Sequence, residues 1–315
     1  MLLRGQVSGL CSGSRDSLLL PVLLLLVRIL PRAIVVAVDA ALLERQCRQG
    51  RAYGFAGKTL IHPAQVDVIN EAFVKYARRP AFTSIGHTVT YQDIDRYSSA
   101  FAYYLQNETN LQRGDAIAIQ MPNLIQYLVV CLGALRAGMV VVNTNPLYTE
   151  RELEHQLNDA DVKVMVVQAN VAQTAASVLP RTGVQTVVVT EIADLHPQPK
   201  RTLINFLVKY VKKMVPAFSI PGALKLNNVL GEGAKTPYRA VILNQDDLAM
   251  LQYTGGTTGV AKGAMLTHGN LIANVLQSDT FFETHDITGE GSTILQPLPV
   301  YHIYAFTASI YALRI

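Results

Sequence analysis

The stretch that decides the fold is Tyr253-Thr254-Gly255-Gly256-Thr257-Thr258-Gly259-Val260-Ala261-Lys262-Gly263. It follows an apolar run from Leu248 to Leu251, which predicts a buried strand. Glycines let the backbone approach an anion closely. Successive backbone N–H groups, threonine hydroxyls and a lysine can together bind a negatively charged ligand. The stretch therefore predicts a loop that binds a polyphosphate at the end of a strand.

Two common phosphate-binding motifs are excluded. The Walker loop needs Gly-Lys followed by Ser or Thr, whereas Lys262 stands between Ala261 and Gly263. The glycine spacing does not match G-x-G-x-x-G either. A glycine-rich turn between two strands is the simpler alternative, because turns are the usual place for such clusters.

The complete string resembles the phosphate-loop signature of the adenylate-forming superfamily, which includes acyl-CoA synthetases, luciferases and peptide-synthetase adenylation domains. The chain is most similar to bacterial long-chain fatty acid–CoA ligases, and the similarity extends through Val141 to Tyr148, Arg151 to Asp159 and Gln296 to Ile303. This resemblance implies that residues 74–315 form a partial N-terminal domain of the AMP-binding fold. That fold is α/β, with mostly parallel sheets flanked by helices.

The pattern of residues 74–315 agrees with this fold class. Strands are predicted at 80–82, 89–91, 116–121, 139–142, 162–167 and 186–190, and helices at 91–106, 122–138 and 169–179. Thr149 and Glu152 form a capping box that begins a further helix. Helix 122–138 is expected to present one apolar face, made by Ile125, Leu128, Val129, Leu132 and Leu135. Alternating strands and helices imply a mostly parallel sheet.

The resemblance implies a reaction in two steps with ATP, Mg²⁺ and CoA. A fatty-acid carboxylate attacks the α-phosphorus of ATP to give an acyl-adenylate and pyrophosphate, and the CoA thiol then displaces AMP. The residues that match the loop around the β- and γ-phosphates are Thr254, Gly255, Gly256, Thr257, Thr258 and Gly259, and Lys262 matches the loop lysine. His302 matches the histidine beside the acyl-adenylate, with a buried structural histidine as the alternative. His155 and His268 are predicted to be structural.

Several motifs of the family do not occur in residues 264–315. These are Tyr-Gly-x-Thr-Glu, whose glutamate helps to hold magnesium, Thr-Gly-Asp, and the lysine motif of the C-terminal domain. The sequence therefore assigns no metal ligand. It predicts a long-chain fatty acid–CoA ligase present as a truncated, inactive fragment. The alternative is a non-catalytic remnant that binds nucleotide or membrane.

Two segments precede the predicted domain. Residues 1–42 are apolar and unassigned; Leu18 to Val27 resembles a short signal segment, but no cleavage site follows and the run is too short to span a membrane. Residues 43–73 resemble the C-terminal tail of a citrate lyase β-subunit-like aldolase. The acidic metal ligands of that family have no counterpart upstream, so no lyase chemistry is expected. The hypothesis is an aldolase tail joined to a ligase.

Composition limits the partners and the location. The net charge is +4 and the basic residues form no long tract, which argues against nucleic acid. Three distant cysteines indicate no disulfide framework and favour a cytoplasmic location. Residues Thr202 to Val215 predict an amphipathic helix with Lys209, Lys212 and Lys213 on one face. A peripheral contact with the inner face of the cell membrane and an ordinary surface helix both fit this pattern.

Overall fold

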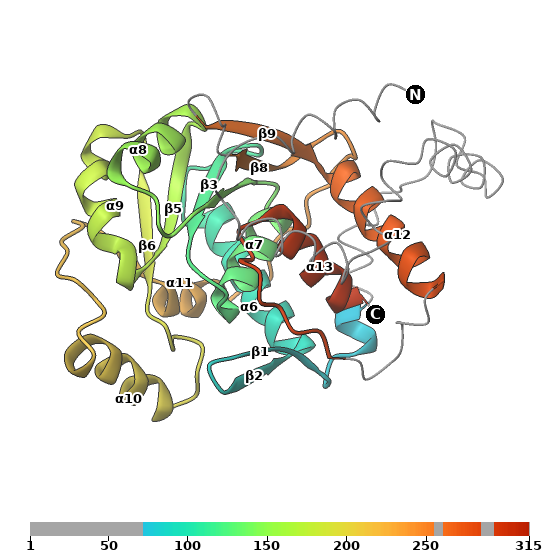
Figure 1. Ribbon diagram of the computed structural model, residues 1–315, viewed down its shortest axis with the longest axis horizontal. Helices are drawn as coiled ribbons and strands as arrows, with labels where there is room; N and C mark the ends of the chain where they lie inside the picture. Colours follow the sequence, from blue (N-terminus) through green and yellow to red (C-terminus); the bar gives the residue numbers. More distant parts are fainter. Residues whose placement is uncertain (1–71, 255–260, 285–292, 315) are drawn as a thin grey trace, which may run out of the picture. The chain divides into compact units, whose positions relative to one another are not determined.

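The computed structural model describes residues 72–254, 261–284 and 293–314. The predicted segments 1–42 and 43–73 lie outside these residues, apart from Ala72 and Phe73. The described residues form an α/β fold in which helices cover both faces of one sheet (Figure 1). The predicted fold class is confirmed.

The sheet has seven strands in the order β7-β6-β5-β3-β4-β8-β9, and all neighbours pair in parallel except β8 and β9. Its strands are β3 (Ala116–Gln120), β4 (Val140–Thr144), β5 (Val162–Gln168), β6 (Thr186–Thr190), β7 (Leu224–Lys225), β8 (Leu248–Thr254) and β9 (Lys262–Thr267). A separate antiparallel hairpin consists of β1 (Pro80–Ser84) and β2 (His87–Thr90). The predicted strands are therefore present, with small differences at their ends.

The helices form the outer layers (Figure 1). They are α6 (Tyr91–Asn107), α7 (Ile125–Arg136), α8 (Glu150–Asp159), α9 (Ala172–Val178), α10 (Lys200–Phe206), α11 (Leu226–Gly233), α12 (His268–Thr284) and α13 (Ile303–Arg314). One hydrophobic core lies between the sheet and α6, α7 and α11, and a second lies between the sheet and α8 and α9. Successive strand residues alternate between these two cores, as the two-residue period of a strand requires.

The start of α8 confirms the predicted capping box. The Thr149 backbone N–H donates to Glu152 Oε2 at 2.9 Å, and the Glu152 N–H donates to Thr149 Oγ1 at 3.4 Å. The hydrogen bond from the Thr149 N–H stabilises the ionised carboxylate and lowers the pKa of Glu152. Local sequence alone therefore defines where this helix begins.

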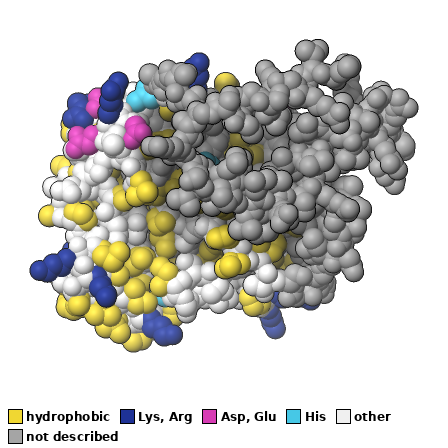
Figure 2. All heavy atoms as spheres, viewed as in Figure 1, with side chains coloured by type: hydrophobic (Ala, Val, Ile, Leu, Met, Phe, Trp, Pro, Cys, Tyr) yellow, Lys and Arg dark blue, Asp and Glu magenta, His cyan; other side chains and the backbone are white. Residues whose placement is uncertain are grey.

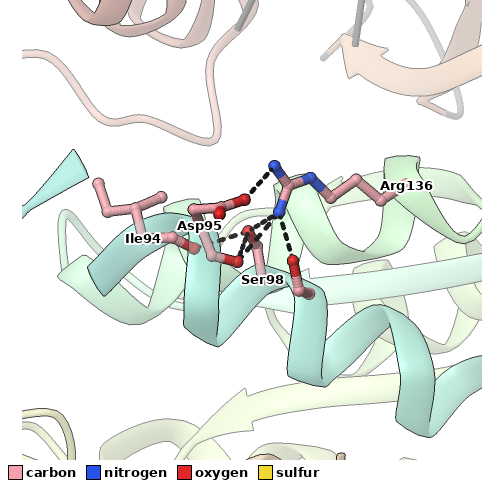
Figure 3. Close-up of polar contacts among 5 residues, drawn as sticks. Ile94, Asp95, Ser98 and Arg136 are labelled. Carbon is pink, nitrogen blue, oxygen red and sulfur yellow. Dashed lines mark hydrogen bonds and ion pairs between the residues drawn. The ribbon is translucent and has the colours of Figure 1, made fainter. Parts of the chain in front are cut away.

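The five residues that were predicted to form an apolar face of α7 are buried, and so is every other residue of the helix. One side of the helix contacts β3 and β4, and α6 packs against another side. Its last residue, Arg136, reaches α6, where it donates to the Asp95 carbonyl at 3.0 Å and the Ser98 hydroxyl at 2.8 Å (Figure 3). Its Nη2 also pairs with the Asp95 carboxylate at 2.7 Å. These contacts satisfy a charge that burial would otherwise make costly.

The predicted helix 202–215 begins earlier and ends earlier. Helix α10 begins at Lys200, after Pro199, and a π-helical turn continues it to Val211. Lys213 has a φ of 50°, which a right-handed helix cannot accommodate. No residue from Lys200 to Val211 is buried. The described residues contain no helix that is long and apolar enough to cross a membrane.

Candidate functional site

Polar side chains gather where three neighbouring parallel strands end. Gln120 ends β3, Asn143 lies near the end of β4, and Gln252 lies near the end of β8; all three are buried. Asn143 and Gln252 occupy paired positions on adjacent strands. In open α/β sheets ligands bind at the carboxyl ends of the strands. This edge is therefore the candidate site.

The side chains at this edge form a hydrogen-bonded chain. The Tyr127 hydroxyl of α7 donates to Asn143 Oδ1 at 2.6 Å, and Asn143 Nδ2 donates to Gln252 Oε1 at 3.1 Å. From the opposite face, Gln156 Nε2 of α8 donates to the Asn143 carbonyl at 3.0 Å. Complete burial raises the pKa of Tyr127 well above its ordinary value, so its hydroxyl remains a donor. These hydrogen bonds fix the positions of β4 and β8 relative to both helical layers.

Two acceptors at the same edge are not satisfied by this network. The Oε1 atoms of Gln120 and Gln156 are buried and accept no hydrogen bond from the described residues. Their amide nitrogens donate to the carbonyls of Asn145 and Asn143, so both side chains end beside β4. A buried acceptor without a donor costs about 1 to 3 kcal/mol. Water or a ligand donor at these two atoms would remove that cost.

The glycine-rich stretch connects β8 to β9 at this edge. The two strands are antiparallel, and Thr254, which ends β8, is paired with Lys262, which begins β9. Both side chains are exposed, so a hydroxyl and an ammonium group are presented together. The other predicted phosphate-binding residues, Gly255 to Gly259, lie outside the described residues. Their predicted role is therefore not tested.

Helix α8 contacts the chain on both sides of the segment from Gly255 to Val260. Before it, the Tyr253 hydroxyl donates to Asp159 Oδ2 at 2.5 Å. After it, His155 Nε2 lies 3.1 Å from the Ala261 carbonyl oxygen. The Tyr253 ring also covers Gly263, where an added Cβ would lie 2.9 Å from the ring. His155 was predicted to be structural without a link to the stretch, and Asp159 had no assigned role; no local pattern reveals either contact.

Two tyrosines from other segments extend the site. Tyr148 follows β4 and is half-buried, and the backbone N–H of Tyr148 donates to the Asn145 carbonyl at 3.2 Å. Burial, then the nearby Glu152 and Tyr301, raise the pKa of Tyr148. Tyr148 also contributes to the raised pKa of Tyr253. Tyr148 also packs against the second hydrophobic core, to which Tyr253 belongs.

His302 is exposed and lies directly before the start of α13. The backbone N–H of His302 donates to the Pro299 carbonyl at 2.9 Å, and the backbone carbonyl of His302 accepts from the Phe306 N–H at 2.9 Å. The imidazole lies next to the Tyr301 ring, with 5.7 Å between the two ring centroids.

His268 is buried at the start of α12, as a structural histidine would be. The backbone N–H of His268 donates to the backbone carbonyl of Asp247 at 3.0 Å. Burial lowers the pKa of His268, Asp247 opposes this effect and Arg113 adds to it. Within the described ranges no group of three or more His, Cys, Asp or Glu side chains could hold a metal ion.

Residues 69–315 match the family described as AMP-binding enzyme. Because this match covers most of the chain, the protein belongs to the AMP-binding enzyme family. The match begins before residue 74, the predicted start of the domain. It includes Phe73, which is buried and packs 6.3 Å from the Tyr91 ring. The comparisons give no support to the aldolase resemblance of residues 43–73.

Curated relatives narrow the similarity within the family. The chain is 47% identical over 248 residues to a long-chain-fatty-acid–CoA ligase of Haemophilus influenzae, covering 78% of this chain and 44% of the relative. It is 46% identical over 242 residues to the ligase of the same name from Escherichia coli O157:H7, covering 77% and 43%. The chain therefore spans less than half the length of these relatives.

Solved structures share the fold. A long-chain-fatty-acid–CoA ligase from Archaeoglobus fulgidus aligns with a TM-score of 0.61 and 25% identity, covering 79% of this chain and 45% of that one. ATP-bound MatB from Rhodopseudomonas palustris aligns with a TM-score of 0.58 and 27% identity, covering 79% and 43%. The predicted relationship to acyl-CoA ligases is confirmed.

Proposed function

We propose that this chain forms the ATP-binding part of a long-chain fatty acid–CoA ligase. The reaction converts ATP, a fatty acid and CoA to acyl-CoA, AMP and diphosphate through an acyl-adenylate. The observation that carries the proposal is the 47% identity with a ligase of that name over 248 residues. The family match over residues 69–315 includes the strands, the edge and the glycine-rich stretch described above.

In this proposal the chain's own residues act mainly by positioning and by charge. The paired Thr254 and Lys262 bring a hydroxyl donor and a positive charge to the two ends of the glycine-rich stretch. This pair fits a triphosphate, because charge-assisted hydrogen bonds to phosphate oxygens are the strong ones. We assign the β- and γ-phosphates to these residues and to Gly255 to Gly259. Preorganised donors of this kind stabilise the charge that develops during phosphoryl chemistry.

His302 and Tyr301 are assigned to the acyl-adenylate. His302 is exposed, and its backbone is held by the first turn of α13, so the imidazole can face a ligand. A magnesium ion would neutralise phosphate charge in this reaction. The described residues offer no cluster of ligands for one, so we assign no magnesium site and route no step through it. CoA enters the proposal as the acceptor of the acyl group.

The test is ATP–pyrophosphate exchange with the chain as it stands. Exchange that depends on palmitate and not on acetate supports the proposal, and Lys262→Ala should raise the KM for ATP by roughly tenfold, the loss expected for about 1.4 kcal/mol of binding. Lys225→Ala, an exposed lysine on β7, is the matched control. Nucleotide binding without exchange would favour the alternative, a non-catalytic nucleotide-binding module. That result would also support the predicted inactivity.

We also propose that α10 contacts the inner face of the cell membrane, where a fatty acid is delivered to a cytoplasmic ligase. Leu203 and Phe206 of α10 share one face with Leu207 and Tyr210 of the π-helical turn that continues it, and all four are 40% to 58% exposed. An ordinary surface helix packs its apolar face against the core. Here the opposite face is attached, through Asn205, which accepts from the Ala193 N–H at 2.9 Å and donates to Glu191 and Asp194.

The charges around this apolar face suit an anionic lipid surface. Lys209, Lys212 and Lys213 are all exposed beside it. Figure 2 shows hydrophobic side chains gathered in the region where Figure 1 places α10, with lysine or arginine side chains at their border. Basic residues that flank an apolar helix face are typical of interfacial binding.

Vesicle pelleting tests this contact. The chain should pellet with vesicles that contain phosphatidylglycerol and much less with pure phosphatidylcholine. Replacing Lys209, Lys212 and Lys213 with glutamate should abolish the difference. The control carries the same change of charge elsewhere, at Arg78, Lys225 and Lys235, which are exposed. Equal pelleting of both triple variants would end the proposal.

A further inference from the structure

Asn123 occupies a short turn between a strand and a helix at the candidate site. The turn follows the end of β3 at Gln120 and precedes the start of α7 at Ile125, so Asn123 lies at the carboxyl edge of the sheet. Its backbone carbonyl accepts a hydrogen bond from the Ser84 hydroxyl of β1 at 3.2 Å. This bond links the turn to the β1–β2 hairpin and does not involve the Asn123 side chain.

The side chain of Asn123 makes three hydrogen bonds to one distant segment. Nδ2 donates to the carbonyl of Gln296 at 3.1 Å and to that of Leu298 at 2.9 Å. Oδ1 accepts from the N–H of Val300 at 2.8 Å. Both donors and one acceptor of the amide are thus used on three alternate residues. No other side chain type offers two N–H donors and an acceptor at this length.

This segment has few other ways to be held. Residues 293–298 contain no helix or strand, and Pro297 and Pro299 carry no N–H for pairing with a strand. Gln296 Nε2 donates to Ala305 and Ser309, which belong to the α13 that the segment itself leads into. Among the described residues, the hydrogen bonds that join the backbone of 296–300 to the sheet are those of Asn123. The buried side chain of Val300 adds an apolar contact.

We propose that Asn123 is a positioning residue for His302. It holds residues 296–300 against the carboxyl edge of β3, and the His302 N–H, bonded to the Pro299 carbonyl, carries that position into the first turn of α13. This inference rests on the proposed function, because His302 acts there on the acyl-adenylate.

The closest isostere separates a polar role from a packing role. Asn123→Asp preserves the volume and the acceptor for Val300, but it places a carboxylate oxygen against two carbonyl oxygens. Asn123→Ala removes all three hydrogen bonds. If Asn123 positions His302, both variants impair the site. If Asn123 only fills space, Asn123→Asp resembles the wild type. Ser84→Ala is the control, because it removes a bond to the Asn123 backbone and leaves the side chain intact.

Two measurements decide the proposal. Hydrogen–deuterium exchange measures the exchange rates of the backbone amides of Val300, Tyr301 and His302. These rates should be about tenfold higher or more in both Asn123 variants, since a lost hydrogen bond of about 1.4 kcal/mol corresponds to that factor. Pyrophosphate exchange should show a kcat lower by about tenfold or more, with the KM for ATP within twofold, because misplacement affects the reacting groups and spares the phosphate loop. Ser84→Ala should change neither.

The outcomes keep this proposal separate from the proposed function. If the wild type shows no pyrophosphate exchange, the proposed function fails and the amide measurement still tests the attachment of residues 296–300. If Asn123→Asp retains wild-type amide protection and kcat, the positioning role is wrong. If Asn123→Ala does not fold by circular dichroism, the isosteric Asn123→Asp variant decides alone.

Discussion

The hydroxyl of Tyr253 donates to the carboxylate of Asp159, and this bond joins the last turn of α8 to the strand that enters the glycine-rich stretch. The two residues are far apart in sequence and come from different layers of the fold. Burial and the Asp159 carboxylate both raise the pKa of Tyr253 above its ordinary value of 10.0. The phenol therefore stays protonated and donates across the neutral pH range.

Replacing Tyr253 with phenylalanine removes this bond and keeps the ring over Gly263. We expect Tyr253→Phe to lower the free energy of unfolding by about 1 kcal/mol, the usual net value of one hydrogen bond. Urea titration followed by circular dichroism measures it. Tyr304→Phe, at an exposed tyrosine, should change nothing. Because the folded pKa is raised, the difference between wild type and Tyr253→Phe should shrink as the pH rises above 10.

Alanine substitutions at two glycines of α11, two residues apart, should change stability in opposite directions. A Cβ on Gly233 would lie 1.8 Å from the Ala100 carbonyl oxygen of α6, whereas a Cβ on Gly231 would meet nothing within 4 Å. Gly233→Ala should therefore cost about 3 kcal/mol, because backbone must move. Gly231→Ala should stabilise by about 0.5 to 1 kcal/mol through helix propensity. Melting temperatures of the pair measure this, and equal shifts would show that α6 and α11 do not pack as described.

Arg136 has a buried guanidinium and Arg96 an exposed one, so their contributions to stability should differ. Arg136 binds Asp95, Ser98 and Ser99 and its side chain is 4% exposed. Arg136→Met should destabilise by about 2 to 4 kcal/mol, because several charge-assisted hydrogen bonds in a buried site are lost.

The matched change at the surface is Arg96→Met. Arg96 pairs with Asp93 three residues earlier, and its side chain is 60% exposed. Such pairs contribute about 0.5 kcal/mol or less. Guanidinium chloride would screen both pairs, so urea is the denaturant to use. A loss at Arg96 as large as that at Arg136 would contradict the assignment of Arg136 as the buried link between α6 and α7.

Because His268 is buried, we expect the stability of the fold to decrease at acidic pH. Burial lowers the pKa of His268 below its ordinary value of 6.5, so between the folded and unfolded pKa values the unfolded chain binds more protons. Stability should therefore fall as the pH drops below 6.5. His268→Gln should flatten this dependence in urea midpoints measured from pH 5 to 8. The same slope in both proteins would assign the effect to other groups.

Short-range patterns predicted most of the elements correctly. The capping box at Thr149 and the buried strands depend on residues within a few positions of one another, where hydrogen bonds and side-chain periodicity act. The glycine-rich stretch was recognised for the same reason. The predicted bounds 202–215 were wrong at both ends, because α10 begins at Lys200, its π-helical continuation ends at Val211 and Lys213 has a positive φ.

Contacts between residues far apart in the sequence could not be predicted from local patterns. The complete burial of α7 depends on α6, and the exposed apolar face of α10 depends on the absence of a described neighbour over it. Asn123 meets Val300 only because β3 ends at the edge where residues 296–300 lie. Local sequence determines which segments form strands, helices and loops, since those interactions are local. The order of the strands decides which loops share an edge, and therefore which side chains make the site.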